Sequence, residues 1–462
     1  MALSRRGFLA SSLAAALVGC GGDARQRRAA APATATTALD PSRPKHLQGP
    51  YAPVGEERTL ADLEVTGTIP PELTGTYVRN GPHPWPVPAG DYDWFTGDGM
   101  VHGVRLEAGR ATWYRNRWIR TAARGEDPGG AAEPFPAPNM ANTSVVRHGG
   151  RTMALYEVGL PHELDDELGT VGRLDPAGGS VVTAHPKADP ATGELHLFGY
   201  VPTLRYAVLD RDGRLLRSTP VDVGRISMMH DFSLTGRWAV FYDLPVVFDP
   251  ALVDRPLPFR WQPEGGARVG VVPRDHSRPV RWIDLPGPAF AFHTLNAYDD
   301  GPDRIVVDLA RHESFLAGET SEPPMLHRWT VDLAAGRVAD ERLDDRPVEF
   351  PRVAAADVGR RHRHGWSVAL GAESSGSHDI GSGIVWHDLD RGTSRLLDLG
   401  AGRVAGEPTH VDGWLVSLVL DQASGTSELV VLSADDPGEG VVGRVHLPVR
   451  VPVGFHGTWI PL

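Results

Sequence analysis

Short runs of apolar and β-branched residues follow one another from Lys45 to the last residue, and turn-forming residues separate them. Runs of this length and composition predict β-strands. The clearest ones are residues 195–200, 237–242, 304–309, 383–386, 413–420 and 428–432. Turn signatures at 210–213, 334–336 and 390–392 close several of them and indicate hairpins.

Helical patterns are few and short, and the best one covers residues 161–168. Many short antiparallel strands indicate a sandwich, a barrel or a propeller. The length of 462 residues favours a propeller, because each four-stranded blade uses several tens of residues. No recurring Trp-Asp or kelch signature accompanies the strands. The pattern therefore predicts an all-β protein and leaves its architecture open.

The first 44 residues differ from the rest of the chain. Residues 1–22 hold Arg5-Arg6 followed by Phe8-Leu9, and then an apolar run too short to span a bilayer. This order is typical of a twin-arginine signal peptide, and Leu17-Val18-Gly19-Cys20 resembles a bacterial lipobox whose cysteine becomes lipidated. Residues 23–44 lack large apolar groups and predict a disordered tether, which leaves 45–462 as a single domain. We therefore expect export by the twin-arginine route, with lipidated Cys20 anchoring the protein at a membrane surface that faces the periplasm or the cell exterior. The alternative is a plain export signal that is cleaved elsewhere.

Composition excludes several classes of protein. The formal net charge is −12 and no dense basic stretch occurs in the body of the chain, so nucleic acid is not an expected partner. The single cysteine permits neither an internal disulfide nor a cysteine-rich zinc site.

Four histidines lie in similar settings far apart in the chain. Each is next to an apolar or aromatic residue and a turn-forming one, a setting that suits a metal ligand because its ring must be held in one rotamer away from water. They are His185, His230, His293 and His456. Neutral imidazole suits zinc, copper, iron and nickel. The four could meet only where separate elements converge, such as a propeller axis, and their spacing alone has low specificity.

The chain from Lys45 onward resembles the carotenoid cleavage oxygenase family. The similarity covers essentially the whole predicted domain and includes the stretches around the four histidines. Further matching segments are residues 75–82, 94–102, 142–146, 157–161 and 450–459.

This resemblance implies a seven-bladed β-propeller with a loop and short-helix cap over the active-site face. It implies one Fe(2+) ion on the propeller axis, with His185, His230, His293 and His456 as its ligands. Three family glutamates hydrogen-bond the other ring nitrogens of three ligands, and they correspond to Glu157, Glu349 and Glu407. Thr143 corresponds to a threonine whose methyl group crowds one coordination position.

The family implies a non-haem Fe(II) dioxygenase that cleaves a C=C double bond of a carotenoid or apocarotenoid to two carbonyl products. One branch instead cleaves stilbenes, and it carries a lysine just before the first glutamate and a tyrosine near Trp118, both of which hold a phenol. This chain has Tyr156 at the first position and Trp118 at the second, and neither offers an ammonium for a phenolate. We therefore expect an apolar polyene and dioxygen as substrates, with a stilbene-like molecule as the alternative.

Three readings compete with this one. A zinc hydrolase on a propeller lacks an obvious carboxylate base beside the histidines. A non-enzymatic propeller lipoprotein would make the four histidines and three glutamates accidental. Within the family, an isomerase or another non-cleaving activity remains open.

Overall fold

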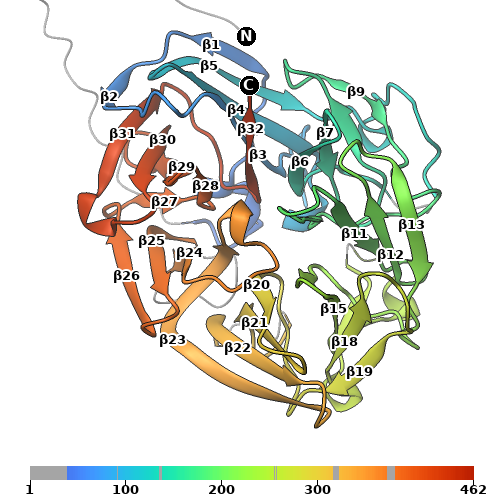
Figure 1. Cartoon of the computed structure of the whole chain (residues 1–462). Coiled ribbons are helices and arrows are strands. Elements are labelled where there is room, and N and C mark those ends of the chain that lie inside the picture. The colour runs from blue at the N-terminus through green and yellow to red at the C-terminus, as the bar shows by residue number, and fades with distance from the viewer. Residues whose placement is uncertain are drawn as a thin grey trace, which may run out of the picture.

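Strands of the chain form blades around one central axis (Figure 1). The computed structural model describes residues 39–90, 92–134, 138–253, 255, 257–315, 322–371 and 380–462. Neighbouring strands within every blade pair antiparallel. Within the described ranges, these blades number seven and give an all-β propeller, which confirms the expected fold class.

The first four blades follow the chain from the N-terminal side. Blade 1 holds β1 (Arg58–Ala61), β5 (Arg110–Trp118), β4 (Gly99–Glu107), β3 (Gly75–Pro82) and β32 (Gly457–Pro461). Blade 2 holds β6 (Ser144–His148), β7 (Arg151–Leu155), β8 (His162–Leu164) and β9 (Thr170–Arg173). Blade 3 holds β10 (Lys187–Ala188), β11 (Leu195–Gly199), β12 (Arg205–Leu209) and β13 (Leu215–Pro220). Blade 4 holds β14 (Ser233–Leu234), β15 (Trp238–Asp243), β18 (Arg268–Pro273) and β19 (Arg281–Asp284).

The remaining blades complete the ring. Blade 5 holds β20 (Thr294–Asp299), β21 (Arg304–Arg311), β22 (Met325–Asp332) and the first part of β23 (Arg337–Arg352). Blade 6 holds the end of β23, β24 (His364–Leu370), β25 (Ile380–Asp388) and β26 (Thr393–Asp398). Blade 7 holds β27 (Arg403–Ala405), β28 (Thr409–Val411), β29 (Trp414–Asp421), β30 (Thr426–Ser433), β31 (Val441–Leu447) and β2 (Val65–Gly67).

Short elements connect the blades. A separate hairpin consists of β16 (Val246–Phe248) and β17 (Phe259–Trp261). The helical segments of the described residues are all single 3-10 turns: η1 (Lys45–Leu47), η2 (Gly49–Tyr51), η3 (Trp94–Thr96), η4 (Ala122–Arg124), η5 (Pro250–Leu252), η6 (Pro263–Gly265), η8 (Ala355–Asp357) and η9 (Pro437–Glu439). None of the described helices is long and apolar enough to cross a membrane.

Two strands close the ring between the first and last blades. Near the start of the chain, β2 pairs with β31 and becomes the outer strand of blade 7. Near the end, β32 pairs with β3 and completes blade 1 (Figure 1). The early strand β2 therefore belongs to the blade built mainly by the C-terminal part of the chain. The last strand, β32, belongs to the blade built mainly by the N-terminal part.

The hydrophobic core lies between adjacent blades. One cluster packs Val240 and Val269 of blade 4 against Val307 and Trp329 of blade 5. A separate cluster fills each of the other six interfaces, including the one between blades 7 and 1. Apolar side chains on both faces of the middle strands explain why those runs read as continuous hydrophobic segments.

The six predicted strands are confirmed as parts of β11, β15, β21, β25, β29 and β30, and the three predicted turns connect neighbouring strands. The predicted helix at 161–168 is wrong, because this stretch forms β8 and a turn. Asp165 Oδ1 accepts hydrogen bonds from the amides of Glu167 and Gly169 and stabilises the turn. The amides and carbonyls of β7 also need a partner strand, and β8 supplies it.

The signal peptide, the lipobox and Cys20 lie outside the described residues, as does the predicted tether up to residue 38. Within the rest of the predicted tether, the Asp40 amide donates to Gln48 Oε1. Gln48 Nε2 in turn donates to the Asp40 carbonyl. These two bonds attach residue 40 to the start of the domain.

Candidate metal centre

Each blade delivers predicted site residues where the chain reaches the axis. His185, His230, His293 and His456 lie just before β10, β14, β20 and β32, which are the edge strands of blades 3, 4, 5 and 1. Thr143 and Glu157 come from blade 2, Glu349 from the end of β23, and Glu407 from the connection between β27 and β28. All eight predicted residues are therefore collected around the axis, and all seven blades contribute.

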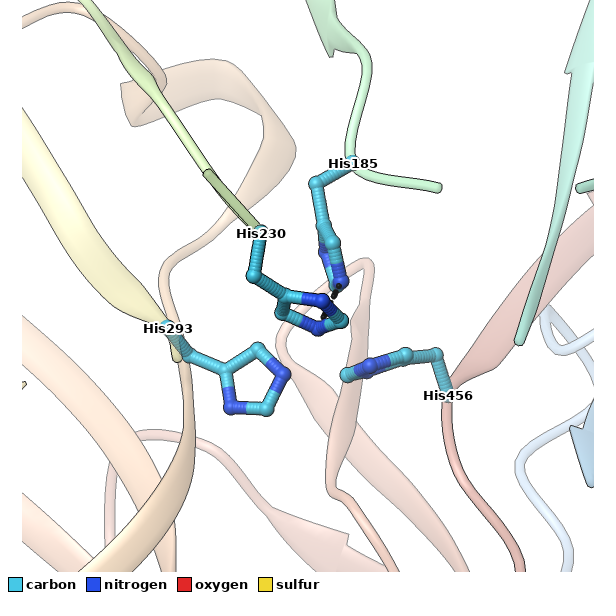
Figure 2. Close-up of side chains that lie close together, drawn as sticks. All are labelled: His185, His230, His293 and His456. Atoms are coloured by element: carbon cyan, nitrogen blue, oxygen red, sulfur yellow. Dashed lines mark hydrogen bonds between the residues drawn. The ribbon is translucent and has the colours of Figure 1, made fainter. Parts of the chain in front are cut away.

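The four histidine rings converge on one point (Figure 2). Each ring offers one nitrogen, and these four nitrogens all lie within 4.8 Å of one another. The Nε2 atoms of His185 and His230 are 2.9 Å apart. Two nitrogens bound at right angles to one ion at about 2.1 Å would lie about 3.0 Å apart. This separation therefore fits two neighbouring ligands of a single metal ion.

Three of the histidines contact a carboxylate through the other ring nitrogen. His230 Nδ1 donates to Glu157 Oε2 at 2.6 Å, and His293 Nδ1 donates to Glu349 Oε2 at 2.6 Å. His456 Nδ1 donates to Glu407 Oε1 at 3.0 Å. An ionised carboxylate only accepts hydrogen bonds, so we assign the proton of each ring to Nδ1. This tautomer leaves the Nε2 lone pair free for a metal.

The electrostatics of the site favour neutral imidazoles at two positions. Burial, together with the neighbouring rings, holds the pKa of His185 well below its usual range. Burial also lowers the pKa of His456 to about 4, although Glu407 opposes the shift. Burial acts in the same direction on His230, but the contact with Glu157 outweighs it and raises the pKa of that ring. Neutral imidazole is the protonation state that binds metals.

Two further residues hold the carboxylates, and no sequence pattern indicated either of them. His312 Nε2 donates to Glu349 Oε1 at 3.0 Å, so this buried carboxylate connects two histidines. The Tyr200 hydroxyl donates to Glu157 Oε1 at 2.9 Å. His312 and Tyr200 each directly follow an ordinary apolar strand, so only the fold reveals their role.

A cavity of about 660 Å³ reaches the cluster from one side. Its wall is mostly apolar, and η3 and the loop after η5 contribute to it. This part of the wall provides the loop and short-helix cap that the resemblance implied. Tyr156 and Thr143 line the cavity, and Phe95, Phe292, Phe350 and Phe455 supply aromatic surface beside the histidines.

Trp118 is not among the described residues that line this cavity. Its Nε1 donates to the His83 carbonyl, and its ring packs against the Arg124 guanidinium. Of the two positions compared with stilbene-cleaving relatives, only Tyr156 therefore lies among the described residues that line the cavity.

A second, more polar cavity of about 220 Å³ reaches the cluster along the axis. His293 and His456 border both cavities, whereas His185 borders only the polar one and His230 only the apolar one. The histidine cluster therefore lies between an apolar chamber and a polar axial one.

The donor set fits a transition metal of the iron or zinc type. Four imidazole nitrogens face one point, and three of the rings are oriented by carboxylates. The buried His293 Nε2 has no hydrogen-bond partner among the described residues. Asp189, Glu194 and His196 form another close group. Arg274 Nη2 contacts all three of those side chains, so this group is an ion-pair cluster.

Comparison with known proteins places these features in context. The family model of the Retinal pigment epithelial membrane protein matches residues 51–461. A carotenoid cleavage oxygenase of Mycobacterium tuberculosis is 38% identical over 91% of this chain and 98% of its own. The crystal structure of Pseudomonas brassicacearum lignostilbene dioxygenase superposes with a TM-score of 0.83 at 31% identity, over 92% of this chain and 100% of that one. Cobalt-substituted apocarotenoid oxygenase of Synechocystis gives a TM-score of 0.79 at 26% identity, over 89% and 97%.

Proposed function

This chain belongs to the carotenoid cleavage oxygenase family, and we propose that it is an iron-dependent dioxygenase that cleaves a C=C bond of a carotenoid or apocarotenoid. Membership makes it an oxidoreductase that uses dioxygen. The identity of the metal, its ligands and the substrate are our proposals. The observation that carries them is a cluster of four histidines, three of them held by carboxylates, at the end of an apolar cavity.

We assign the metal ligands to the ring nitrogens of His185, His230, His293 and His456, with Glu157, Glu349 and Glu407 as their orienting carboxylates. Ferrous iron in such a site supplies the activation of dioxygen. One O2 is consumed per double bond, and each carbon of that bond receives one oxygen to give two carbonyl products. No net proton transfer is needed, so the protein requires no general acid or base beside the substrate.

The side chains of the cavity position the substrate and exclude water. Phenylalanine rings on several sides offer a planar polyene contact surface without polar groups to desolvate. Thr143 borders the cavity next to the cluster, and its hydroxyl donates to Asn142 Oδ1. Its backbone carbonyl accepts from the His456 amide at 3.3 Å, so Thr143 also connects the cavity wall to the last histidine.

Few cations occur among the described residues that line the apolar cavity, and this supports a polyene over a phenol. Among the described residues that line the cavity, Arg255 is the sole cation, and it is exposed. The residue before Glu157 is Tyr156, and burial raises the pKa of its hydroxyl. A neutral phenol group at this position lacks the positive charge that a lysine would offer to a phenolate substrate.

A hydroxystilbene is the second candidate substrate. It is favoured by the likeness to lignostilbene dioxygenase, which has the higher identity of the two solved structures compared above. An aromatic cavity also accepts two phenyl rings.

Metal analysis and product analysis test the proposal together. The protein is reconstituted anaerobically with ferrous iron and assayed with an apocarotenal and a hydroxystilbene under ¹⁸O2. We expect one iron per chain, loss of that iron in His293→Ala, and cleavage of the apocarotenal with label in both products. Cleavage of the stilbene alone would keep the metal site and refute the substrate. Tightly bound zinc, or no metal, would refute the metal assignment.

We further propose that residues 1–22 direct twin-arginine export and that Cys20 is lipidated, with 45–462 as the catalytic domain. Fractionation of cells that express the full chain tests this. The wild type should be found with membranes, and Cys20→Ser should be soluble. Equal fractionation of both would contradict lipidation.

A further inference from the structure

The residues that follow three of the histidines meet in one polar network. Lys187 lies two residues after His185, Asp231 follows His230, and Thr294 follows His293. Lys187 Nζ is 2.7 Å from Asp231 Oδ1. The Thr294 amide and hydroxyl donate to Asp231 Oδ2 at 2.9 and 2.8 Å.

Asp231 is the centre of this network. The Phe232 amide also donates to its Oδ1 at 2.8 Å, so the carboxylate receives three hydrogen bonds and one ion pair. Its side chain is 3% exposed, and it borders the polar axial cavity behind the histidines. Lys187 balances its charge, so the pair adds little net charge to the metal region.

The three partners belong to three different blades. Lys187 begins β10 of blade 3, Asp231 precedes β14 of blade 4, and Thr294 begins β20 of blade 5. The glutamates act on ring orientation through Nδ1, but they do not join the main chains that carry His185, His230 and His293. Asp231 connects those segments behind the rings, through the main-chain amide of Thr294 and the side chain of Lys187.

We propose that Asp231 is a positioning residue of the metal centre, which fixes the relative positions of the His185, His230 and His293 main chains. This inference rests on the proposed role of these histidines as ligands. The physical reason is that a tetradentate site binds tightly only if its donors are held in place before the metal arrives. When each donor is carried by a separate blade, the donors are held in place only if a contact near the axis connects those blades.

The test compares Asp231→Asn and Lys187→Met with a matched control. Glu428→Gln serves as the control, because Glu428 is also a buried carboxylate paired with cations, Arg403 and Arg444, but on β30 away from both cavities. Cobalt(II) is the probe. Its affinity is measured by competition with a chelator, its ligand geometry by visible absorption, and the stability of the metal-free protein by thermal unfolding.

We expect both network variants to bind cobalt about 10-fold more weakly, the lower end of the range for groups that support metal ligands. Their cobalt absorption bands should shift, whereas Glu428→Gln should lower the melting temperature and leave affinity and bands unchanged. The double variant Asp231→Asn/Lys187→Met should also bind cobalt weakly, because it restores the charge balance but does not restore the connection between the blades.

Wild-type affinity and bands in Asp231→Asn and Lys187→Met would overturn the inference. Recovery in the double variant would also overturn it, because that would show an effect of charge. Failure of the proposed function is a separate outcome, in which the wild type itself binds no cobalt or iron. Lys187 is 20% exposed and not part of a hydrophobic cluster, so Lys187→Met should fold even if Asp231→Asn does not.

Discussion

Glu349→Gln is the most informative single change in the centre. Glu349 is fully buried and accepts hydrogen bonds from His293 Nδ1, His312 Nε2 and the Phe350 amide. Burial alone would raise the pKa of Glu349, but the contacts with His293 and His312 outweigh it and hold the pKa below its usual range. The carboxylate is therefore ionised at neutral pH, and glutamine removes its charge while keeping its shape.

These contacts determine how much metal affinity and stability Glu349→Gln should lose. Glutamine has one acceptor oxygen where glutamate has two, so its NH2 group must face either His293 or His312. If it faces His293, that ring must turn its Nδ1 lone pair to the amide, which places a proton on Nε2 where the metal would bind. Loss of such a carboxylate typically weakens metal binding about 10–100-fold, which corresponds to about 1.4–2.7 kcal/mol. In the metal-free protein, one unsatisfied buried group costs about 1–3 kcal/mol.

The assay is chelator competition for ferrous or cobalt(II) ion, with urea unfolding of the metal-free protein. Glu157→Gln is the matched comparison. Its side chain is 17% exposed at the cavity, and the Tyr200 hydroxyl can rotate to accept from the new amide. We therefore expect Glu349→Gln to lose more metal affinity and more stability than Glu157→Gln. Equal or reversed losses would refute the argument from burial and the number of donors.

Three other predictions concern stability and specificity. Burial lowers the pKa of His196 to about 3, well below the ordinary histidine pKa of about 6.5. The unfolded chain therefore binds a proton there that the folded protein does not, and the free energy of unfolding should fall by up to about 1.4 kcal/mol per pH unit below pH 6.5. Urea unfolding between pH 7 and 5 checks this, and His196→Gln should make the decline less steep. Gly199→Ala would place a Cβ atom 2.0 Å from the Val181 carbonyl and should cost about 1–3 kcal/mol in thermal unfolding, whereas Gly287→Ala, with open space around it, should be neutral. Tyr156→Lys should raise the turnover of a hydroxystilbene relative to that of an apocarotenal, because an ammonium stabilises a phenolate, and an unchanged ratio of rates would count against Tyr156 as a specificity residue.

The local sequence was sufficient to predict the strands that are buried on both faces. β29 and β30 read as continuous apolar runs because they lie between other strands and between neighbouring blades. The helix predicted at 161–168 does not form, because pairing of β8 with β7 outweighs the local helical preference. No local pattern indicates that β7 requires this partner strand.

In the metal centre, too, the sequence predicts some of the residues and only the fold shows the others. The four histidines stood out by their local settings, whereas the three glutamates came from the family resemblance. The convergence of these residues depends on blade order, which local pattern did not reveal. His312, Tyr200 and Asp231 contribute through contacts between segments that are distant in sequence. Such contacts arise only when neighbouring blades pack together.

Ring closure also determines at which stage of synthesis the metal centre and blade 1 become complete. A nascent chain that has completed blades 2 to 6 already contains His185, His230 and His293, but His456 and β32 are made after blade 7. Until then β3 lacks its neighbour at the axis and the centre has three of its four imidazoles. A truncated product should therefore carry both an exposed sheet edge and a weak metal site, two marks by which proteases and chaperones can distinguish it from the finished enzyme.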